Sequence, residues 1–290
     1  MQVRSELTVG MAQIASASGD VEGNLGRHVR LIDEARARDV DLLVFPELSL
    51  SGCDVLGHMP QVARTLDDPE LQALAEHSHD LSLVVGFVER AADGGYYNAL
   101  VYLEGGVARH VHRKVYLVTA DGISERRIFS EGRSVRAFGT RFGPLAMLNC
   151  EDAWHLPMPY LAVMDGARLL LTCAATPYGP PTQLPSDELW LTINRAYAIV
   201  LEAANVFVNR SGQEGSLRFF GGSHVVAATG EVLVTGPAEE CVVTQRISLD
   251  DVLAQRFAVS YVRDERLALT ARELGRLLAK EPHTPPGAPA

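Results

Sequence analysis

The feature that most constrains this chain is the regular alternation of strand-like and helix-like segments. "LTVGMAQI" (residues 7–14) alternates residues that favour strands, and the stretch over 23–40 has apolar side chains at helical spacing with charged residues opposite. "DLLVFPEL" (41–48) is then a short continuous apolar run, typical of a buried strand. Strand, helix, strand in this order indicates a layered α/β sheet.

The same alternation continues through most of the chain. Two strands over 96–114 are joined by a Glu-Gly-Gly turn, so some neighbours are predicted to be antiparallel, while others are separated by helices. Further helices are predicted over 68–80, 157–167 and 186–203, and further strands over 81–90, 142–150, 168–175, 205–212, 221–236 and 241–248. Tight turns and helical crossovers together predict an α/β sandwich with mixed sheets.

We expect one domain over residues 1–281, because no linker rich in Pro, Gly and Ser divides the pattern. Residues 282–290 have the composition of a disordered tail. The segment 265–281 is amphipathic, with Leu267, Ala271, Leu274 and Leu278 on one stripe. We expect this helix to pack on its own domain, and a role in dimerisation is the less favoured alternative.

Charge and apolar patterning exclude several functional classes. A net charge of −10 argues against nucleic-acid binding, which needs clustered Lys and Arg. No apolar run reaches the length of a membrane span, and the first residues do not form a signal peptide. Four cysteines without a C-x-x-C pair fit a reducing compartment, so we expect a cytoplasmic protein. No nucleotide, redox or serine-hydrolase motif is present, and we expect no cofactor.

Three predicted strands end in residues that could carry chemistry: Glu47, Lys114 and Cys150. A strand end aims a side chain while leaving it accessible, so reactive groups are often placed there. A neutral thiol with a pKa near about 8.5 is a weak nucleophile and needs a base or a cation. Glu47 could supply the base and Lys114 the cation, and the Glu151 backbone N–H could help to bind an oxyanion.

Taken singly, each of these residues has an ordinary structural interpretation, but their surroundings are similar to those of one family. The chain resembles the nitrilase-like carbon-nitrogen hydrolases, whose catalytic trio is Glu, Lys and Cys. The resemblance extends over nearly the whole chain, in the segments "VFPEL" (44–48), "YYNALVYL" (96–103), "RKVYL" (113–117), "SERRIFSEG" (124–132), "NCED" (149–152), "DGARLLLTCAATPYG" (165–179) and "GGSHVVAATGEVL" (221–233).

The resemblance implies a four-layer αββα sandwich, usually paired into a homodimer. It implies that Glu47 is the general base and later acid, that Lys114 stabilises the tetrahedral intermediate, and that Cys150 is the nucleophile. A second glutamate, expected between the lysine and the cysteine, matches Glu125, which would orient Lys114. Glu131 is the alternative candidate.

The run "CEDAWH" resembles the corresponding run in the glutaminase domains of glutamine-dependent NAD synthetases. This likeness implies either a free-standing amidase or a separate subunit that delivers ammonia to a synthetase. The resemblance implies that glutamine recognition in that branch uses polar and basic residues, whereas "TPYGPPTQLPSDE" offers Thr176, Tyr178 and Gln183 but no cation. As substrate-binding candidates we name Glu151, Tyr116, Trp154, Thr176 and Tyr178.

Two other classes stay open from the residues alone. His110 and His112 share one face of a strand and could bind a metal, with Asp121 and Glu125 as further ligands or base. A non-catalytic binding protein on the same fold is also compatible, since fold does not fix function. The favoured interpretation is an amidase that acts on a small-molecule carboxamide through a cysteine thioester. Nitrile and N-carbamoyl substrates are less favoured.

Overall fold

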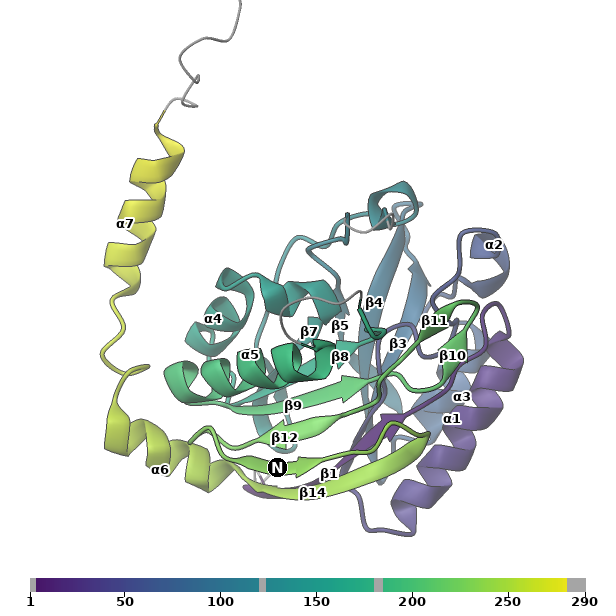
Figure 1. Cartoon of the computed structure of the whole chain (residues 1–290), viewed down its shortest axis with the longest axis horizontal. Helices are drawn as coiled ribbons and strands as arrows, with labels where there is room; N and C mark the ends of the chain where they lie inside the picture. The colour runs from purple at the N-terminus through teal and green to yellow at the C-terminus, as the bar shows by residue number, and fades with distance from the viewer. Residues whose placement is uncertain (1–3, 120–123, 180–184, 281–290) are drawn as a thin grey trace, which may run out of the picture.

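A computed structural model describes residues 4–119, 124–179 and 185–280. Two six-stranded sheets pack face to face, and helices cover their outer faces (Figure 1). The predicted four-layer α/β sandwich with mixed sheets is therefore confirmed. The predicted tail over 282–290 lies outside the described residues.

The first sheet has the order β14-β1-β2-β3-β4-β5. Its strands are β14 (Cys241–Ser248), β1 (Glu6–Gln13), β2 (Leu42–Val44), β3 (Ser82–Arg90), β4 (Tyr96–Glu104) and β5 (Val107–Arg113). β1, β2 and β3 are parallel, and the other pairs are antiparallel. β5 therefore runs in the same direction as β2, and the chain leaves both strands at the same edge of the sheet.

The second sheet has the order β13-β12-β9-β8-β7-β6. Its strands are β13 (Val232–Thr235), β12 (His224–Val226), β9 (Ala204–Asn209), β8 (Leu169–Ala174), β7 (Gly143–Asn149) and β6 (Phe138–Thr140). β7, β8 and β9 are parallel, so the residues that follow them share one edge. A small hairpin, β10 (Gln213–Glu214) with β11 (Leu217–Arg218), follows β9.

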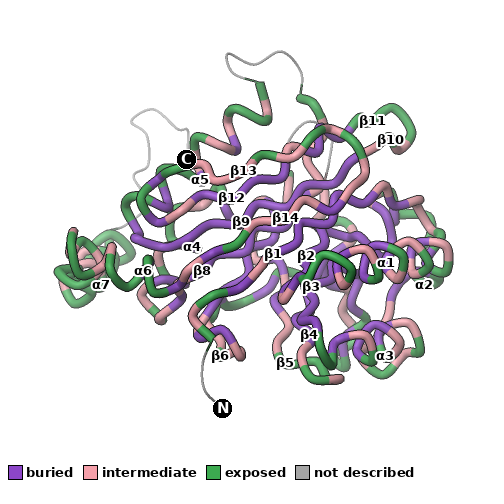
Figure 2. Tube along the Cα trace, turned by 90° about the horizontal axis from the view of Figure 1, so that it is seen from below, coloured by how far each residue is buried: buried purple, intermediate pink, exposed green. Residues whose placement is uncertain are grey.

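Three apolar layers hold the four structural layers together. On the first sheet, α1 (Val21–Arg36), α2 (Met59–Val62) and α3 (Pro69–Glu76) supply side chains to an outer core. On the second sheet, α4 (Pro157–Met164) and α5 (Ser186–Leu201) form the other outer core. The middle core lies between the sheets, and most residues of the central strands are buried (Figure 2). Burial on both faces explains why these strands read as continuous apolar runs.

The C-terminal helices depart from one expectation. α6 (Leu249–Val259) contacts the middle core, but α7 (Leu267–Leu278) has no buried residue and extends away from the sandwich (Figure 1). The prediction that this amphipathic helix packs on its own domain is therefore wrong for the described chain. Leu278, for example, is 86% exposed. None of the described helices combines the length and the hydropathy needed to cross a bilayer.

Candidate active site

Three charged side chains from separate segments meet at the edge where β2 and β5 end. Glu47 lies in the turn after β2, Lys114 directly follows β5, and Glu125 begins the single-turn helix η1 (Glu125–Arg127). The Lys114 ammonium lies 2.6 Å from Glu47 Oε1 and 2.9 Å from Glu125 Oε2. Lys114 is only 1% exposed, so its charge is balanced by these carboxylates rather than by water.

Polar groups around the cluster fix both carboxylates. The Asn98 amide from β4 donates to Glu47 Oε1 (2.8 Å) and to Glu125 Oε1 (3.2 Å). The backbone N–H of Ala175 donates to Glu47 Oε2 (3.0 Å), and that of Val118 donates to Glu125 Oε2 (2.8 Å). Both carboxylates are therefore oriented from more than one direction, which limits the positions that Lys114 can take.

Cys150 lies where β7 ends and a short 3-10 helix, η2 (Cys150–Trp154), begins. Its φ of 48° is in the left-handed region, where a residue with a side chain costs about 1–3 kcal/mol. Such strain persists only where surrounding contacts enforce it, and it is concentrated at functional sites. The residue is 9% exposed, and its Sγ lies 3.7 Å from Thr176 Oγ1.

The electrostatics of this sulfur and of the charged cluster are coupled. Burial raises the pKa of the Cys150 thiol well above its ordinary value, the Glu47 carboxylate raises it further, and the Lys114 ammonium opposes both. Burial alone would lower the pKa of Lys114, but Glu47 and the other acidic groups raise it well above the ordinary value. Burial also raises the pKa of Glu125, against the effect of Lys114. The pKa values of Cys150, Lys114 and Glu125 are therefore all raised, and Lys114 is held as an ammonium.

A buried pair joins the lysine segment to the cysteine turn. His112 Nε2 lies 2.7 Å from Asp152 Oδ2, and both side chains are buried. Asp152 Oδ1 accepts from the backbone N–H groups of Val115 and Tyr116, each at 3.0 Å. Asp152 also caps η2 together with Asn149. One carboxylate thus ties the residues after β5 to the first turn after β7.

The predicted substrate-binding residues near η2 have partners of their own. Glu151 is half-buried, and its Oε1 lies 3.7 Å from His155 Nε2. Tyr116 stacks on His155, with ring centroids 3.5 Å apart, and Trp154 packs edge-on against Trp190 at 5.1 Å. These side chains form a polar and aromatic surface beside Cys150.

Thr176 and Tyr178 follow β8, and one neighbour of Tyr178 was not foreseen. Tyr178 is 47% exposed, and the Arg218 guanidinium from β11 lies 5.4 Å from its ring centroid. The Tyr178 N–H donates to the Arg218 carbonyl at 2.8 Å. A cation therefore stands beside this segment although none lies within it. Gln183, the other candidate there, lies outside the described residues.

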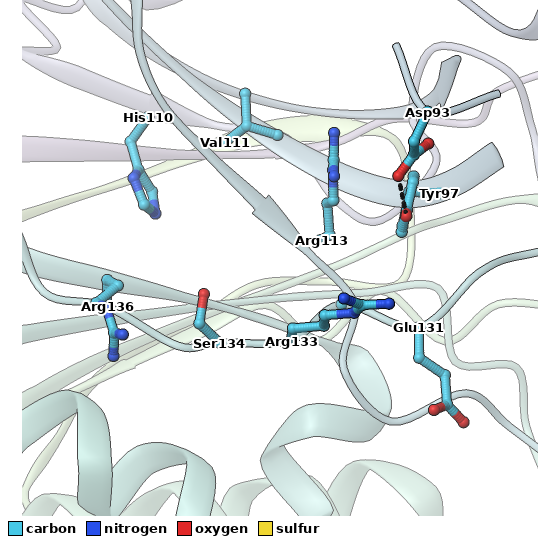
Figure 3. Close-up of a pocket in the computed structure, with 10 residues that line it drawn as sticks. Asp93, Tyr97, His110, Val111, Arg113, Glu131, Arg133, Ser134 and Arg136 are labelled. Atoms are coloured by element: carbon cyan, nitrogen blue, oxygen red, sulfur yellow. Dashed lines mark hydrogen bonds between the residues drawn. The ribbon is translucent and has the colours of Figure 1, made fainter. Parts of the chain in front are cut away.

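The two strand histidines have other partners. His112 binds Asp152, and His110 stacks on Phe138 with ring centroids 4.2 Å apart. His110 lines a separate cavity of about 640 Å³, together with Arg113, Glu131 and Arg133 (Figure 3). Within the described ranges, no group of three His, Cys, Asp or Glu side chains is placed to hold a metal ion. Asp121 lies outside those ranges.

The contacts of Glu131 and Glu125 distinguish these two candidates for the second glutamate. Glu131 pairs with Arg126 at 2.9 Å and lines the separate cavity, whereas Glu125 contacts Lys114. Of the two glutamates considered from the sequence, only Glu125 lies in the Lys114 cluster.

Several polar residues of the site were not identified from the sequence. Asn98 donates to Glu47, and Trp190 donates to the Thr176 hydroxyl. Asn209 binds both the N–H and the carbonyl of Thr176. Asn98 carried a usable signal, because it is a polar residue inside an apolar strand, where burial demands a partner. Trp190 had none, since an aromatic residue on an amphipathic helix is ordinarily part of the core.

Proteins of similar sequence point to one family. Residues 8–257 match the family model described as "Carbon-nitrogen hydrolase". The chain is 32% identical over 273 residues to an "(R)-stereoselective amidase" from Pseudomonas, covering 92% of this chain and 94% of the amidase. It is 31% identical over 291 residues to a "Glutamine-dependent NAD(+) synthetase" from Thermotoga maritima, covering 97% of this chain but 49% of the synthetase.

A solved structure supports the fold. The carbon-nitrogen hydrolase from Helicobacter pylori superimposes with a TM-score of 0.82 at 24% identity, over 93% of this chain and 98% of that one. The chain spans about half of the length of the synthetases it matches and nearly the full length of the amidase. It belongs to the carbon-nitrogen hydrolase family, the nitrilase superfamily.

Proposed function

We propose that the protein is an amidase that cleaves a small-molecule carboxamide with Cys150 as nucleophile. The observation that carries this proposal is the buried contact of Lys114 with Glu47 and Glu125, together with the effect of these charges on the pKa of the Cys150 thiol, which is held at a strained turn. Placing an ammonium and two carboxylates in the interior is costly, and nothing in the sandwich's stability requires it. A site for acyl transfer does require it, because charge develops there during the reaction.

In the proposed first half-reaction, Glu47 takes the Cys150 proton as the sulfur attacks the amide carbon. The carbonyl oxygen becomes an oxyanion, which Lys114 and the Glu151 N–H stabilise. That N–H lies in the first turn of η2, where the helix supplies no acceptor of its own. The C–N bond then breaks, Glu47 returns its proton to the departing nitrogen, and ammonia or an amine leaves.

The second half-reaction removes the acyl group. Water attacks the thioester carbon, and Glu47 accepts one of its protons. The C–S bond breaks, the carboxylic acid is released, and the proton returns to the sulfur through Glu47. Glu125 touches Lys114 but not the sulfur in this scheme, and its role is to hold the ammonium in place.

The proposal is tested by ammonia release from a panel of carboxamides, with Cys150→Ala and Cys150→Ser as variants. Both are expected to lose turnover while keeping the thermal unfolding profile, because the substitutions remove at most one sulfur atom. A chelator is added in a parallel assay, and activity should persist. Turnover by Cys150→Ala equal to that of the unmodified protein, or loss with the chelator and recovery with zinc, would reject the mechanism.

A second candidate function is a glutaminase that supplies ammonia to a separate synthetase. It is favoured by the similarity to the NAD(+) synthetases and by the Arg218 guanidinium beside Tyr178, which could bind the carboxylate of glutamine. Kinetics on glutamine and on an uncharged amide of similar length distinguish the candidates. Arg218→Gln should raise KM for glutamine alone if this function is correct.

We also propose that the chain forms a homodimer. Large apolar side chains are exposed along the helices of the second sheet and the C-terminus, an arrangement that monomers seldom leave open to water. The exposed residues include Leu156, Leu161, Val200, Phe257, Leu274 and Leu278. Sedimentation at several concentrations tests this, and Leu161→Glu with Val200→Glu should shift the mass toward that of one chain.

A further inference from the structure

A hydrogen-bond chain reaches the Cys150 sulfur from the side of α5. Trp190 is 1% exposed, and its indole Nε1 donates to Thr176 Oγ1 at 3.2 Å. The same hydroxyl oxygen lies 3.7 Å from Cys150 Sγ, within range of a hydrogen bond to sulfur. The indole, the hydroxyl and the thiol therefore form a continuous series of polar atoms.

The chemistry of these groups fixes the direction of the chain when Cys150 is a thiolate. An indole N–H can only donate, so Thr176 Oγ1 must be its acceptor. A hydroxyl has a single hydrogen, and among the hydrogen bonds of the described residues the only other partner of this oxygen is Cys150 Sγ. In the neutral thiol either atom can be the donor, but a thiolate sulfur can only accept, so the Thr176 hydroxyl donates to it once Cys150 has lost its proton. The Glu47 carboxylate, which raises the pKa of the same thiol, is the candidate base for that proton.

The neighbours of Thr176 and Trp190 hold the Thr176 hydroxyl next to the sulfur. The Thr176 N–H donates to Asn209 Oδ1 at 2.9 Å, and the Asn209 amide returns a bond to the Thr176 carbonyl at 3.1 Å. The Trp190 ring stacks on Phe207 with centroids 4.7 Å apart and meets Trp154 edge-on. Turning the hydroxyl away would leave a buried indole N–H without an acceptor, which is costly.

We propose that Thr176 donates a hydrogen bond to the Cys150 sulfur that stabilises the thiolate, and that Trp190 is a positioning residue which fixes this donor. The inference deepens the proposed function and rests on it. It assigns the Thr176 hydroxyl to the nucleophile, whereas the sequence suggested contact with the substrate. Stabilisation of the sulfur anion in this way offsets part of the effect of burial and of Glu47 on its pKa.

The test measures thiolate formation rather than turnover. The rate of carbamidomethylation of Cys150 by iodoacetamide is followed between pH 6 and 11 by mass spectrometry of the peptide that contains it, so that the other three cysteines do not interfere. Thr176→Val keeps the shape but removes the hydroxyl, and it should move the midpoint upward by about one pH unit, since a charged hydrogen bond and one pKa unit are similar in free energy. Thr176→Ser keeps the donor and should restore the midpoint.

The role of Trp190 is separated by a double substitution. Trp190→Phe retains an aromatic ring but removes the N–H, and it should raise the midpoint by less than Thr176→Val does. In the Thr176→Val background the same change should add nothing, because the donor it fixes is already gone. Thermal unfolding of each variant shows that the comparison is made between folded proteins.

Three results would overturn the inference: an unchanged midpoint in Thr176→Val, an equal shift in Thr176→Ser, or an equal effect of Trp190→Phe in both backgrounds. None of them depends on the identity of a substrate. Failure of the proposed function would be seen separately, as active Cys150→Ala, while the midpoints could still shift as described.

Discussion

At the scale of single residues, Lys114 is the most informative side chain of the site. It stands between two carboxylates, which would repel each other in a buried space without it. Its burial and that of Glu47 mean that removing the ammonium leaves uncompensated negative charge. The same residue is thus tied both to folding stability and, in the proposed mechanism, to the oxyanion.

Lys114→Met, which keeps the length of the side chain but not the charge, should therefore change two quantities. Turnover should fall about 100-fold to 1000-fold, the usual cost of one oxyanion donor. The free energy of unfolding should fall by roughly 3–5 kcal/mol, the cost of breaking a buried ion pair. Steady-state kinetics and urea unfolding measure the two.

Arg126→Met is the matched control, because its ion pair with Glu131 is exposed. Exposed pairs contribute about 0–1 kcal/mol, so both quantities should stay near those of the unmodified protein. Equal behaviour of the two variants would argue against a special role for Lys114.

At the scale of elements, two glycines allow the segments of the site to approach each other. A Cβ added at Gly86 in β3 would lie 2.3 Å from the Pro46 carbonyl oxygen, against the turn that holds Glu47. A Cβ added at Gly132 would lie 2.0 Å from the Arg113 carbonyl oxygen and 3.0 Å from that of Lys114. Backbone atoms cannot yield as a flexible side chain can, so the segments themselves would have to move.

Gly132→Ala should displace the Lys114 segment, lower stability by about 1–3 kcal/mol and lower turnover by roughly 100-fold, as expected for a shift near 1 Å. Gly139→Ala is the control, since nothing lies within 4 Å of its added Cβ. Thermal unfolding and steady-state kinetics should show a loss in Gly132→Ala and no change in Gly139→Ala. Identical values would show that the close approach at Gly132 is unimportant.

The element pattern could be predicted from the sequence, whereas the neighbours of most side chains could not. Hydrophobic periodicity identified most of the longer helices and strands but missed α2, α6 and β6. The Glu47, Lys114 and Cys150 positions were recognisable as strand ends. Asn98 meets Glu47, and Arg218 meets Tyr178, through strand pairing across many residues, which local patterns do not encode. The apolar face of α7 has the same sequence pattern whether it packs on its own domain or not, so its exposure was not predictable.

At the scale of the whole molecule, buried histidines contribute to the response to acid. His28, beneath the Glu47 turn, and His224, against α5, each have a pKa lowered from 6.5 to about 4 by burial. As the pH falls, the unfolded chain binds protons first. Stability that is complete above pH 6.5 is therefore lost progressively toward pH 4.

Between pH 6.5 and 5, each histidine should lower the free energy of unfolding by roughly 2 kcal/mol, and the two together by roughly 4 kcal/mol. Chemical unfolding at both pH values measures this loss. His28→Gln should remove roughly 2 kcal/mol of it, while substitution of the exposed His79 should not change it. An equal pH dependence in His28→Gln would contradict the assignment.

The measurement that tests the central claim most directly is the mass of the Cys150 peptide after rapid acid quenching during turnover of an accepted amide. The account predicts an increase that equals the acyl group of that amide, located on the sulfur and absent from Cys150→Ala. Turnover at full rate with no acyl mass on this peptide, or with the mass on another residue, would contradict it.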